Sequence, residues 1–227
     1  MEFEALIKQK INGISENQAE KFKRYFEMLV DWNTRVNLTA ITDAEAVTEK
    51  HFLDSLLPLE LIKKGSRCID IGTGAGFPGI PIAIMREDIE MVLLDSLNKR
   101  VNFLNAVKEE LGLENITCIH ARGEEAAHGE TWREKFDITL SRAVAGVNSL
   151  VEVSVPFLKV GGKSIMLKGP KAQEELLEAQ NALKALSASA DIVEFASSWG
   201  DRCAVVVTKN EKTQKQYPRK GMFKKPL

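Results

Sequence analysis

The spacing of apolar and polar residues changes once along the chain, near residue 67. Before that point, apolar positions recur three and four residues apart, which is typical of helices with one buried face. After it, short runs rich in Val and Ile alternate with longer helical patterns, which favours βαβ units and a parallel sheet. We predict strands over 67–71, 90–95, 116–121, 136–141, 162–168, 191–197 and 203–209, and helices over 79–86, 97–111, 146–157 and 171–187.

The first, helical part of the chain contains one strongly marked helix start. Ser15 to Gln18 have the form of a capping box. In this motif the side chain of the first residue accepts a hydrogen bond from the backbone N–H of the fourth, and the side chain of the fourth accepts one from the backbone N–H of the first. No strand pattern precedes Arg67, so we treat residues 1–64 as a helical extension. The apolar face that follows the capping box is formed by Phe22, Tyr25, Phe26, Leu29 and Val30.

The last two predicted strands are expected to run antiparallel. Only residues 198–201 separate them, which is too short for a crossover helix. A mostly parallel sheet of seven strands that ends in an antiparallel hairpin is a narrower pattern than a general Rossmann-like sheet. The sequence therefore predicts an α/β domain over 65–208, preceded by the helical extension and followed by a short segment, 209–227.

Charge is distributed unevenly along the chain. The formal net charge is −1, yet residues 209–227 contain seven Lys or Arg and a single Glu. The last nineteen residues are thus a basic tail on an otherwise acidic protein. Such a tail either serves solubility or contacts a polyanion such as RNA, and composition leaves both interpretations open.

Composition also argues against several classes of function. Cys68, Cys118 and Cys203 lie far apart and lack metal-ligand spacing, so we expect reduced core residues and no metal site. No stretch approaches the roughly 18 apolar residues of a membrane span, and the first residues lack the basic and apolar parts of a signal peptide. We therefore expect a cytoplasmic protein that makes no membrane contact, with a monomer as the default.

A glycine-rich segment follows the first predicted strand. It runs DIGTGAGFPG from Asp70 to Gly79, and its glycines allow a sharp turn and a close approach of a ligand to the backbone. The next strand ends in Asp95, about twenty residues further on, where a carboxylate can accept hydrogen bonds from both hydroxyls of a ribose. The two features together predict an adenosine-containing cofactor.

The glycine pattern alone also fits a dinucleotide, so other features must decide the cofactor. Asp70 precedes the turn and can meet the ammonium of a methionine moiety; residues 156–163 and the closing hairpin resemble class I S-adenosylmethionine methyltransferases. We therefore expect S-adenosylmethionine, with Gly123 and Glu124 placed against the adenine by analogy with that fold. The other expected cofactor-binding residues are Asp70, Gly72, Thr73, Gly74, Gly76, Phe77, Asp95, Ser96 and Arg142.

The fourth predicted strand leads into Ser141-Arg142-Ala143, where class I methyltransferases place substrate-facing residues. The Asn/Asp-Pro-Pro-aromatic motif of amino-group methyltransferases is absent, and no cysteine is placed to attack a pyrimidine. The N7 lone pair of guanine needs no general base, so positioning would supply most of the acceleration. Arg142 could orient the base through O6, bind a phosphate or the cofactor carboxylate, or instead pair with an internal acid.

Motifs along nearly the whole chain, in order, resemble the RsmG (GidB) family of bacterial 16S ribosomal RNA methyltransferases. The resemblance implies methylation of N7 of guanosine 527 in the 530 loop, with Gly72, Phe77, Gly123, Glu124 and Arg142 at cofactor-binding positions. Two departures are that Gly123 stands where the family more often has Ala or Val, and that the tail lacks a Pro near Phe223. The matching segments include Trp32-Asn33, His51 to Leu56, Asp70 to Pro81, Arg122-Gly123-Glu124, Ser141-Arg142-Ala143, Lys168-Gly169 and Tyr217-Pro218-Arg219.

The same resemblance bears on the RNA-contacting residues. His51 and Asp54 lie three residues apart on one helical face, which by spacing alone favours a surface pair. With the resemblance, they are equally expected to line a cleft between the helical extension and the sheet domain. Lys168, Arg219 and the basic tail are expected to contact phosphates of 16S ribosomal RNA in the small ribosomal subunit.

Two other functions stay open on the sequence alone. One is a small-molecule or protein methyltransferase on the same fold, which would have an enclosed pocket and no need of the tail. The other is a ribosome assembly factor that binds the cofactor without catalysis.

Overall fold

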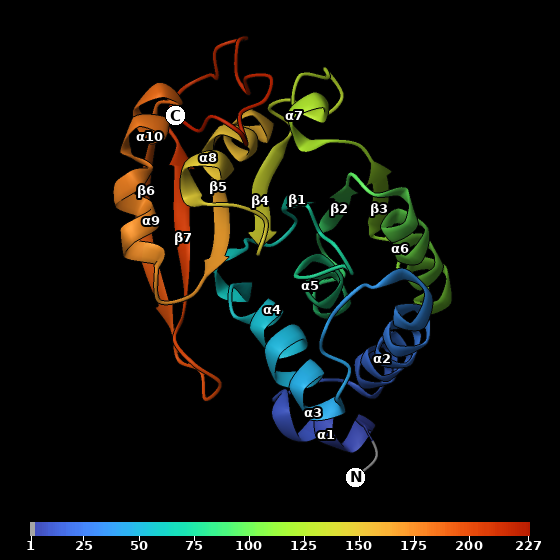
Figure 1. The fold of residues 1–227 in the computed structure, drawn as a ribbon. Coiled ribbons are helices and arrows are strands. Elements are labelled where there is room, and N and C mark those ends of the chain that lie inside the picture. The colour runs from blue at the N-terminus through green and yellow to red at the C-terminus, as the bar shows by residue number, and fades with distance from the viewer. Residues whose placement is uncertain (1–2) are drawn as a thin grey trace.

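A seven-stranded sheet in the order β3-β2-β1-β4-β5-β7-β6 forms the centre of the computed structural model, which describes residues 3–227 (Figure 1). β1 to β5 are parallel, and β7 runs antiparallel to both β5 and β6. The antiparallel closing hairpin is thereby confirmed. The strands are β1 (Arg67–Ile71), β2 (Glu90–Asp95), β3 (Ile116–His120), β4 (Phe136–Arg142), β5 (Leu158–Lys168), β6 (Ala188–Phe195) and β7 (Arg202–Lys209).

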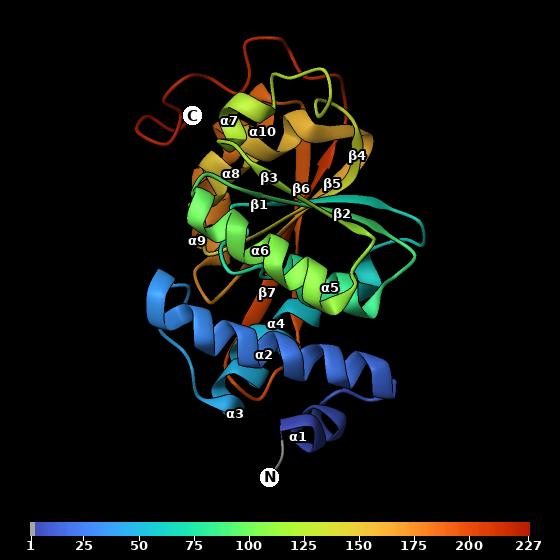
Figure 2. The ribbon, with the colours of Figure 1, turned by 90° about the vertical axis from the view of Figure 1, so that its right-hand side faces the viewer.

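Helices cover both faces of the sheet, and Figure 2 shows the helices and the sheet as successive layers in space. On one face, α5 and α6 pack against the strands, and α2 packs on the outside of these two helices. On the other face, α8, α9 and α10 pack against β5, β7 and β6. The helices are α1 (Phe3–Lys10), α2 (Glu16–Val36), α3 (Ala44–Val47), α4 (Asp54–Leu56), α5 (Gly79–Met85), α6 (Asn98–Leu111), α7 (Gly123–Ala126), α8 (Val147–Ser154), α9 (Ala172–Glu178) and α10 (Gln180–Ala185).

Side chains of the central strands alternate between two apolar cores, because successive residues of a strand point to opposite faces. In β2, Met91 and Leu93 join the core under α5 and α6, whereas Val92 and Leu94 join the core under α8 to α10. Burial on both faces explains why these strands are continuous apolar runs rather than alternating ones.

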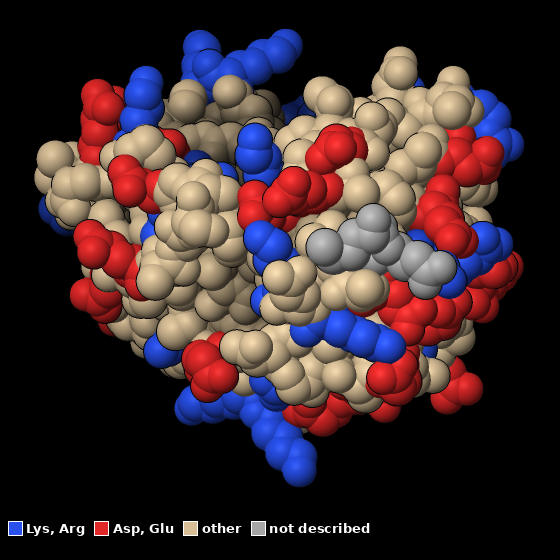
Figure 3. All heavy atoms as spheres, turned by 90° about the horizontal axis from the view of Figure 1, so that it is seen from below, with Lys and Arg blue, Asp and Glu red and all other residues tan. Residues whose placement is uncertain are grey.

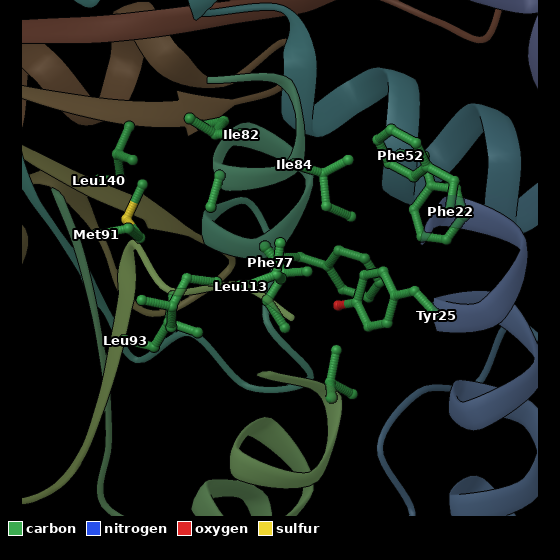
Figure 4. Packing of buried hydrophobic residues seen from close by; sticks show 14 of the residues in the cluster. Phe22, Tyr25, Phe52, Phe77, Ile82, Ile84, Met91, Leu93, Leu113 and Leu140 are labelled. Atoms are coloured by element: carbon green, nitrogen blue, oxygen red, sulfur yellow. The ribbon is translucent and has the colours of Figure 1, made fainter. Parts of the chain in front are cut away.

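The helical extension shares its core with the sheet. The capping box at Ser15 is present and starts α2, as predicted. Figure 4 shows Phe22 and Tyr25 of α2 beside Phe52 and Phe77, and all four belong to the same buried cluster as the strand residues under α5 and α6. Residues 1–64 are thus distinct in sequence pattern, but the part that the structure describes is packed onto the sheet domain.

The segment that carries His51 and Asp54 is one helix with an irregular middle. α3 continues through a π-helical turn, Thr48–Leu53, into α4 without leaving right-handed helical geometry. π turns inside helices are frequently found at functional sites. His51 and Asp54 both contact Arg142 at the end of β4.

Four predicted elements differ from the structure by more than one residue at an end, among them the strand predicted over 191–197, which is β6 (Ala188–Phe195). The strand predicted over 162–168 begins at Leu158, because Gly161 adopts a φ of +83° and the pairing with β4 shifts register instead of ending. The helix predicted over 146–157 finishes in a 3₁₀ turn, Val155–Phe157, that contains Pro156. The helix predicted over 171–187 is two helices that meet at Ala179.

The basic tail is packed rather than free. Tyr217 and Met222 are buried in the core under α8 to α10, and Lys209 is the last residue of β7, with a fully buried side chain that pairs with Glu134. Residues 209–227 are therefore part of the folded domain. Among the tail's cations, the exposed ones are Lys212, Lys215, Lys220, Lys224 and Lys225.

Candidate functional site

The glycine turn follows β1 and is held from inside by Asp70. One carboxylate oxygen, Oδ2, accepts hydrogen bonds from the Thr73 hydroxyl at 2.6 Å and from the Gly79 amide at 2.9 Å. Asp70 is completely buried, and this burial raises the pKa of Asp70 to about 6. Oδ2 of Asp70 thus fixes the shape of the turn, whereas Oδ1 has no hydrogen-bond partner among the described residues, and the contact of Asp70 with the cofactor stays a prediction.

Helix α2 braces the same turn. The buried Tyr25 hydroxyl donates to the Ala75 carbonyl, and the Tyr25 ring lies 5.5 Å from the Phe77 ring, centroid to centroid. Gly76 has a φ of +100°, and a Cβ placed there would lie 2.4 Å from Ile80 Cδ1. Gly74, in contrast, has no atom within 4 Å of its Cβ position, so that side of the turn faces open space.

Asp95, at the end of β2, joins three backbone segments. Its Oδ2 accepts from the Gly74 amide at 2.9 Å, and its Oδ1 accepts from the Leu97 amide at 2.9 Å. The Arg100 guanidinium lies 3.4 Å from Oδ2. The carboxylate thus fixes the glycine turn relative to the start of α6, and Oδ1 retains a lone pair for a further donor.

A cavity of about 220 Å³ opens beside the glycine turn. We call it the turn cavity; it brings together four of the predicted cofactor-binding residues, Gly72, Ser96, Gly123 and Glu124. Val144 and Phe223, which the sequence did not place at the cofactor, are among the other residues of its wall.

A second cavity, of about 510 Å³, lies between the helical extension, β4 and β7. We call it the arginine cavity, and it confirms that His51 and Asp54 line a cleft between the extension and the sheet domain. Four cationic residues surround it: Lys50, Arg142, Lys168 and Arg202.

Asp54 is the centre of the polar contacts in the arginine cavity. Its Oδ2 accepts from Arg142 at 3.1 Å, and its Oδ1 accepts from the Trp199 indole at 3.2 Å and from the Arg202 guanidinium at 2.5 Å. These donors come from the end of β4 and from the β6–β7 hairpin. The internal acid that the sequence offered as an alternative partner of Arg142 is therefore Asp54, and the pair lies in the wall of the cavity.

Arg142 is also held by its other neighbours. It donates to the Lys50 carbonyl at 3.0 Å, and its guanidinium carbon lies 5.0 Å from the centroid of the Phe77 ring. His51 stacks on the same ring, with the centroids 4.6 Å apart. A guanidinium held by four neighbours keeps one orientation, which suits it to present donors to a planar ligand.

His51 is expected to stay neutral in this setting. Burial, and secondly the Arg142 charge, lower the pKa of His51 from 6.5 to about 4. The unfolded chain therefore takes up this proton as the pH falls below 6.5 while the folded protein does not, so the His51 contribution to stability is lost between pH 6.5 and 4. We expect the His51 ring proton resonances, assigned with a His51→Asn variant, to titrate near pH 4 in an NMR experiment. A midpoint above pH 6 would contradict this prediction.

A single short segment separates the two cavities. Ala143 lines the arginine cavity, and the next residue, Val144, lines the turn cavity. Ala143 has a φ of +55°, an uncommon conformation for a residue with a Cβ, and Val144 lies against Gly72, 3.0 Å from its Cβ position. Backbone strain of this kind tends to occur at functional sites.

The structure gives internal partners to two residues that were expected to contact RNA. Lys168 Nζ donates to Glu175 and to the Ala145 carbonyl, both at 2.7 Å. Arg219 forms a bidentate pair with Glu152, which is completely buried on α8. In this conformation the first side chain holds the loop after β4 and the second holds the tail, and contact of either with an RNA phosphate stays a prediction.

Tyr25, Trp199, Arg202 and Phe223 are among the residues of this region that sequence patterns did not single out. Tyr25 was read only as part of an apolar helical face, and the other three lie outside any motif. The signal that could have found Arg202 is its position at the start of a strand beside the closing hairpin. Phe223 carried none, since an aromatic residue in a basic tail has many possible locations.

Other kinds of site receive no support over residues 3–227. Within that range, no group of three or more His, Cys, Asp and Glu side chains is arranged to hold a metal ion. None of the helices seen there combines the length and the apolar character needed to cross a membrane. Cys68 and Cys203 are buried in β1 and β7, and Cys118 is half-buried in β3.

Sequence comparisons give a consistent result over the whole length of the chain. A family model described as "GidB: rRNA small subunit methyltransferase G" matches residues 18–202. The protein named ribosomal RNA small subunit methyltransferase G from Clostridium perfringens is 44% identical to this chain over the full length of both. The protein of that name from Streptococcus gordonii is 43% identical and covers 100% of this chain and 98% of its own.

Solved structures share the fold at low sequence identity. A putative O-methyltransferase from Klebsiella pneumoniae superposes with a TM-score of 0.57 at 14% identity, over 91% of this chain and 95% of that one. P. horikoshii TYW2, in complex with MeSAdo, superposes with a TM-score of 0.55 at 10% identity, over 70% and 63%. These likenesses establish the α/β methyltransferase architecture with its seven-stranded sheet.

Proposed function

Since this chain belongs to the family of ribosomal RNA small subunit methyltransferase G, we propose that it transfers a methyl group from S-adenosylmethionine to N7 of a guanosine in 16S ribosomal RNA. The observation that carries the proposal is the pair of cavities on either side of Ala143 and Val144. A methyl donor and an acceptor must meet from opposite sides for in-line transfer, and one short segment here borders both spaces.

The turn cavity suits the adenosine end of S-adenosylmethionine. Its volume, about 220 Å³, is below the roughly 300 Å³ at which pockets for whole small molecules begin, so it would take only part of the cofactor. Asp95 would accept from the ribose, and the Gly123 backbone with Glu124 would meet the adenine edge. The remaining part would lie along the open side of Gly74. The cofactor would supply an electrophilic methyl group.

The arginine cavity suits a guanosine that has been unstacked from the RNA. Its volume, about 510 Å³, lies within the range of pockets that enclose a nucleotide-sized ligand. Arg142 would orient the base through O6, while Lys50 and Arg202 would face the phosphates. Enzymes that modify a base commonly bind it outside the stack.

The electrostatics of this cavity also suit methylation at a lone pair. Positive charge develops on the guanine ring as the methyl group arrives, and an additional cation beside it would oppose the reaction. His51 is held neutral by its lowered pKa, and the Asp54 carboxylate balances Arg142. No general base is needed, since N7 carries no proton.

The exposed lysines of the tail would bind RNA phosphates. Basic and acidic side chains are mixed on the face seen from below in Figure 3, so that face offers no uniform positive field.

We expect the triple substitution Lys220→Ala, Lys224→Ala and Lys225→Ala to raise KM for small ribosomal subunits about tenfold and to flatten its salt dependence, with kcat unchanged. Steady-state kinetics at several salt concentrations would measure both effects.

A matched control removes three lysines elsewhere. Lys63 and Lys64 precede β1, Lys163 lies within β5, and all three are exposed and line neither cavity. If this control triple lowers affinity as much as the tail triple, the lysines act only through net charge and the tail has no specific role.

The enzymatic proposal itself is tested with labelled S-adenosylmethionine. Purified protein should methylate small subunits from cells that lack the endogenous modification and should leave already modified subunits unlabelled. Borohydride reduction and aniline cleavage would then locate the N7 product. Label that appears only in protein or small molecules would overturn the proposal.

A further inference from the structure

The tail reaches the turn cavity because three anchors fix its path. Arg133 donates to the carbonyls of Tyr217, Thr213 and Gln214 at 2.9 to 3.1 Å. His128 forms a hydrogen bond with the Pro218 carbonyl at 2.8 Å. Both anchors lie between α7 and β4, so the tail crosses the surface next to the end of β3.

The third anchor is the ion pair between Arg219 and Glu152. The Arg219 amide and Nε donate to Glu152 Oε1 at 2.7 and 2.9 Å, and NH2 donates to Oε2 at 2.8 Å. NH2 also donates to the Lys225 carbonyl at 2.9 Å, which closes the last residues into a loop around this arginine. Because Glu152 is completely buried, loss of its ion pair with Arg219 would be strongly destabilising. The loop is therefore held in a fixed position.

Phe223 lies within this loop and faces the turn cavity. Its neighbour Met222 is buried in the core, and a hydrogen bond of 3.0 Å from the Lys224 amide to the Gly221 carbonyl turns the chain between them. The Phe223 side chain is 39% exposed, yet it lines the cavity with Ser96, Gly123 and Glu124. A large aromatic ring left partly open at the mouth of a mostly apolar cavity has apolar area that a ligand would cover.

We propose that Phe223 is a cofactor-binding residue, whose ring covers the adenine of S-adenosylmethionine from the tail side of the turn cavity. This inference rests on the proposed function. Every base has a flat π-face, and stacking on an aromatic side chain contributes by an amount that alanine substitution reveals. The tail, which the sequence presents only as a charged segment, thereby supplies a wall of the cofactor site.

The test compares binding rather than turnover. Phe223→Ala is expected to raise the Kd for labelled S-adenosylmethionine about tenfold in equilibrium dialysis, and to raise the inhibition constant of adenosine by the same factor. Adenosine lacks the methionine part, so an equal effect on both ligands places the contact at the adenosine part and not at the methionine part. Phe223→Trp keeps an aromatic face and should retain affinity within about threefold.

A matched control removes another exposed apolar side chain. Leu177 on α9 is 65% exposed and lines neither cavity, so Leu177→Ala should leave both constants unchanged. Thermal unfolding of every variant without ligand distinguishes lost contact from lost structure. Phe223→Ala should melt within 2 °C or so of the unmodified protein, because the ring is already partly exposed.

The possible failures are distinguishable. If the unmodified protein binds S-adenosylmethionine and Phe223→Ala binds it equally well, the inference about Phe223 is wrong and the proposed function stands. If Phe223→Ala and Phe223→Trp both bind weakly and both melt early, the ring has only a structural role and the inference is again wrong. If the unmodified protein does not bind S-adenosylmethionine, the proposed function fails first.

Discussion

Replacing Arg142 by alanine is expected to lower kcat for methyl transfer by roughly 10²- to 10³-fold, because positioning supplies most of the acceleration when no base is involved. The guanidinium lines the arginine cavity and not the turn cavity, so the Kd for S-adenosylmethionine should change less than threefold. Single-turnover kinetics with small subunits, together with equilibrium dialysis of the cofactor, would measure the two quantities separately.

The fold should survive this substitution. Asp54 keeps hydrogen bonds from Trp199 and Arg202 when Arg142 is removed, so its buried carboxylate is not left without partners. Arg142→Lys retains the charge but loses the planar fork, and we expect it to recover only part of the rate. A tenfold weaker cofactor affinity in Arg142→Ala, with kcat preserved, would instead place Arg142 at the cofactor and overturn its role toward guanine.

Gly76→Ala is expected to disturb the cofactor site strongly. A Cβ at Gly76 would lie 2.4 Å from Ile80 Cδ1 and 2.8 Å from the Tyr25 hydroxyl, and the φ of +100° disfavours any L side chain. The overlap and the strained φ together are expected to lower the free energy of unfolding by about 3 kcal/mol. Since the turn must shift to relieve the overlap, affinity for S-adenosylmethionine should fall at least about 100-fold.

A second glycine separates the two contributions. Gly65 also has a positive φ, +70°, but nothing lies within 4 Å of its Cβ position and it is remote from the turn. Gly65→Ala should therefore lose only about 1 kcal/mol and leave cofactor binding unchanged. Denaturant unfolding and equilibrium dialysis on both variants would provide the comparison. If Gly76→Ala and Gly65→Ala lose the same free energy of unfolding, the overlap with Ile80 and Tyr25 does not destabilise the protein, and this prediction is wrong.

Local sequence patterns were sufficient for most of the sheet domain. The apolar runs located all seven strands, and the four-residue link before Arg202 was enough to predict an antiparallel hairpin. The capping box at Ser15 gave the start of α2. These features depend on hydrogen bonds and burial over a few residues, which the order of side chains encodes directly.

Element bounds were less predictable where glycine and proline had more than one use. Gly161 lies outside the strand predicted over 162–168, whereas the structure accommodates it within β5. A glycine with positive φ fits a turn and a strand irregularity equally well, so only the neighbouring strand decides between them.

The sequence by itself determined the architecture, the glycine turn after β1, the carboxylate at the end of β2 and the basic composition of the tail. Only the tertiary structure decided that Asp70 points into the turn, that Arg219 is occupied by Glu152, and that Phe223 reaches the turn cavity. The physical reason is distance along the chain. Arg219 and Glu152 are separated by 67 positions, and Arg202 and Asp54 by 148, so these pairs form only when the whole sheet brings their elements together.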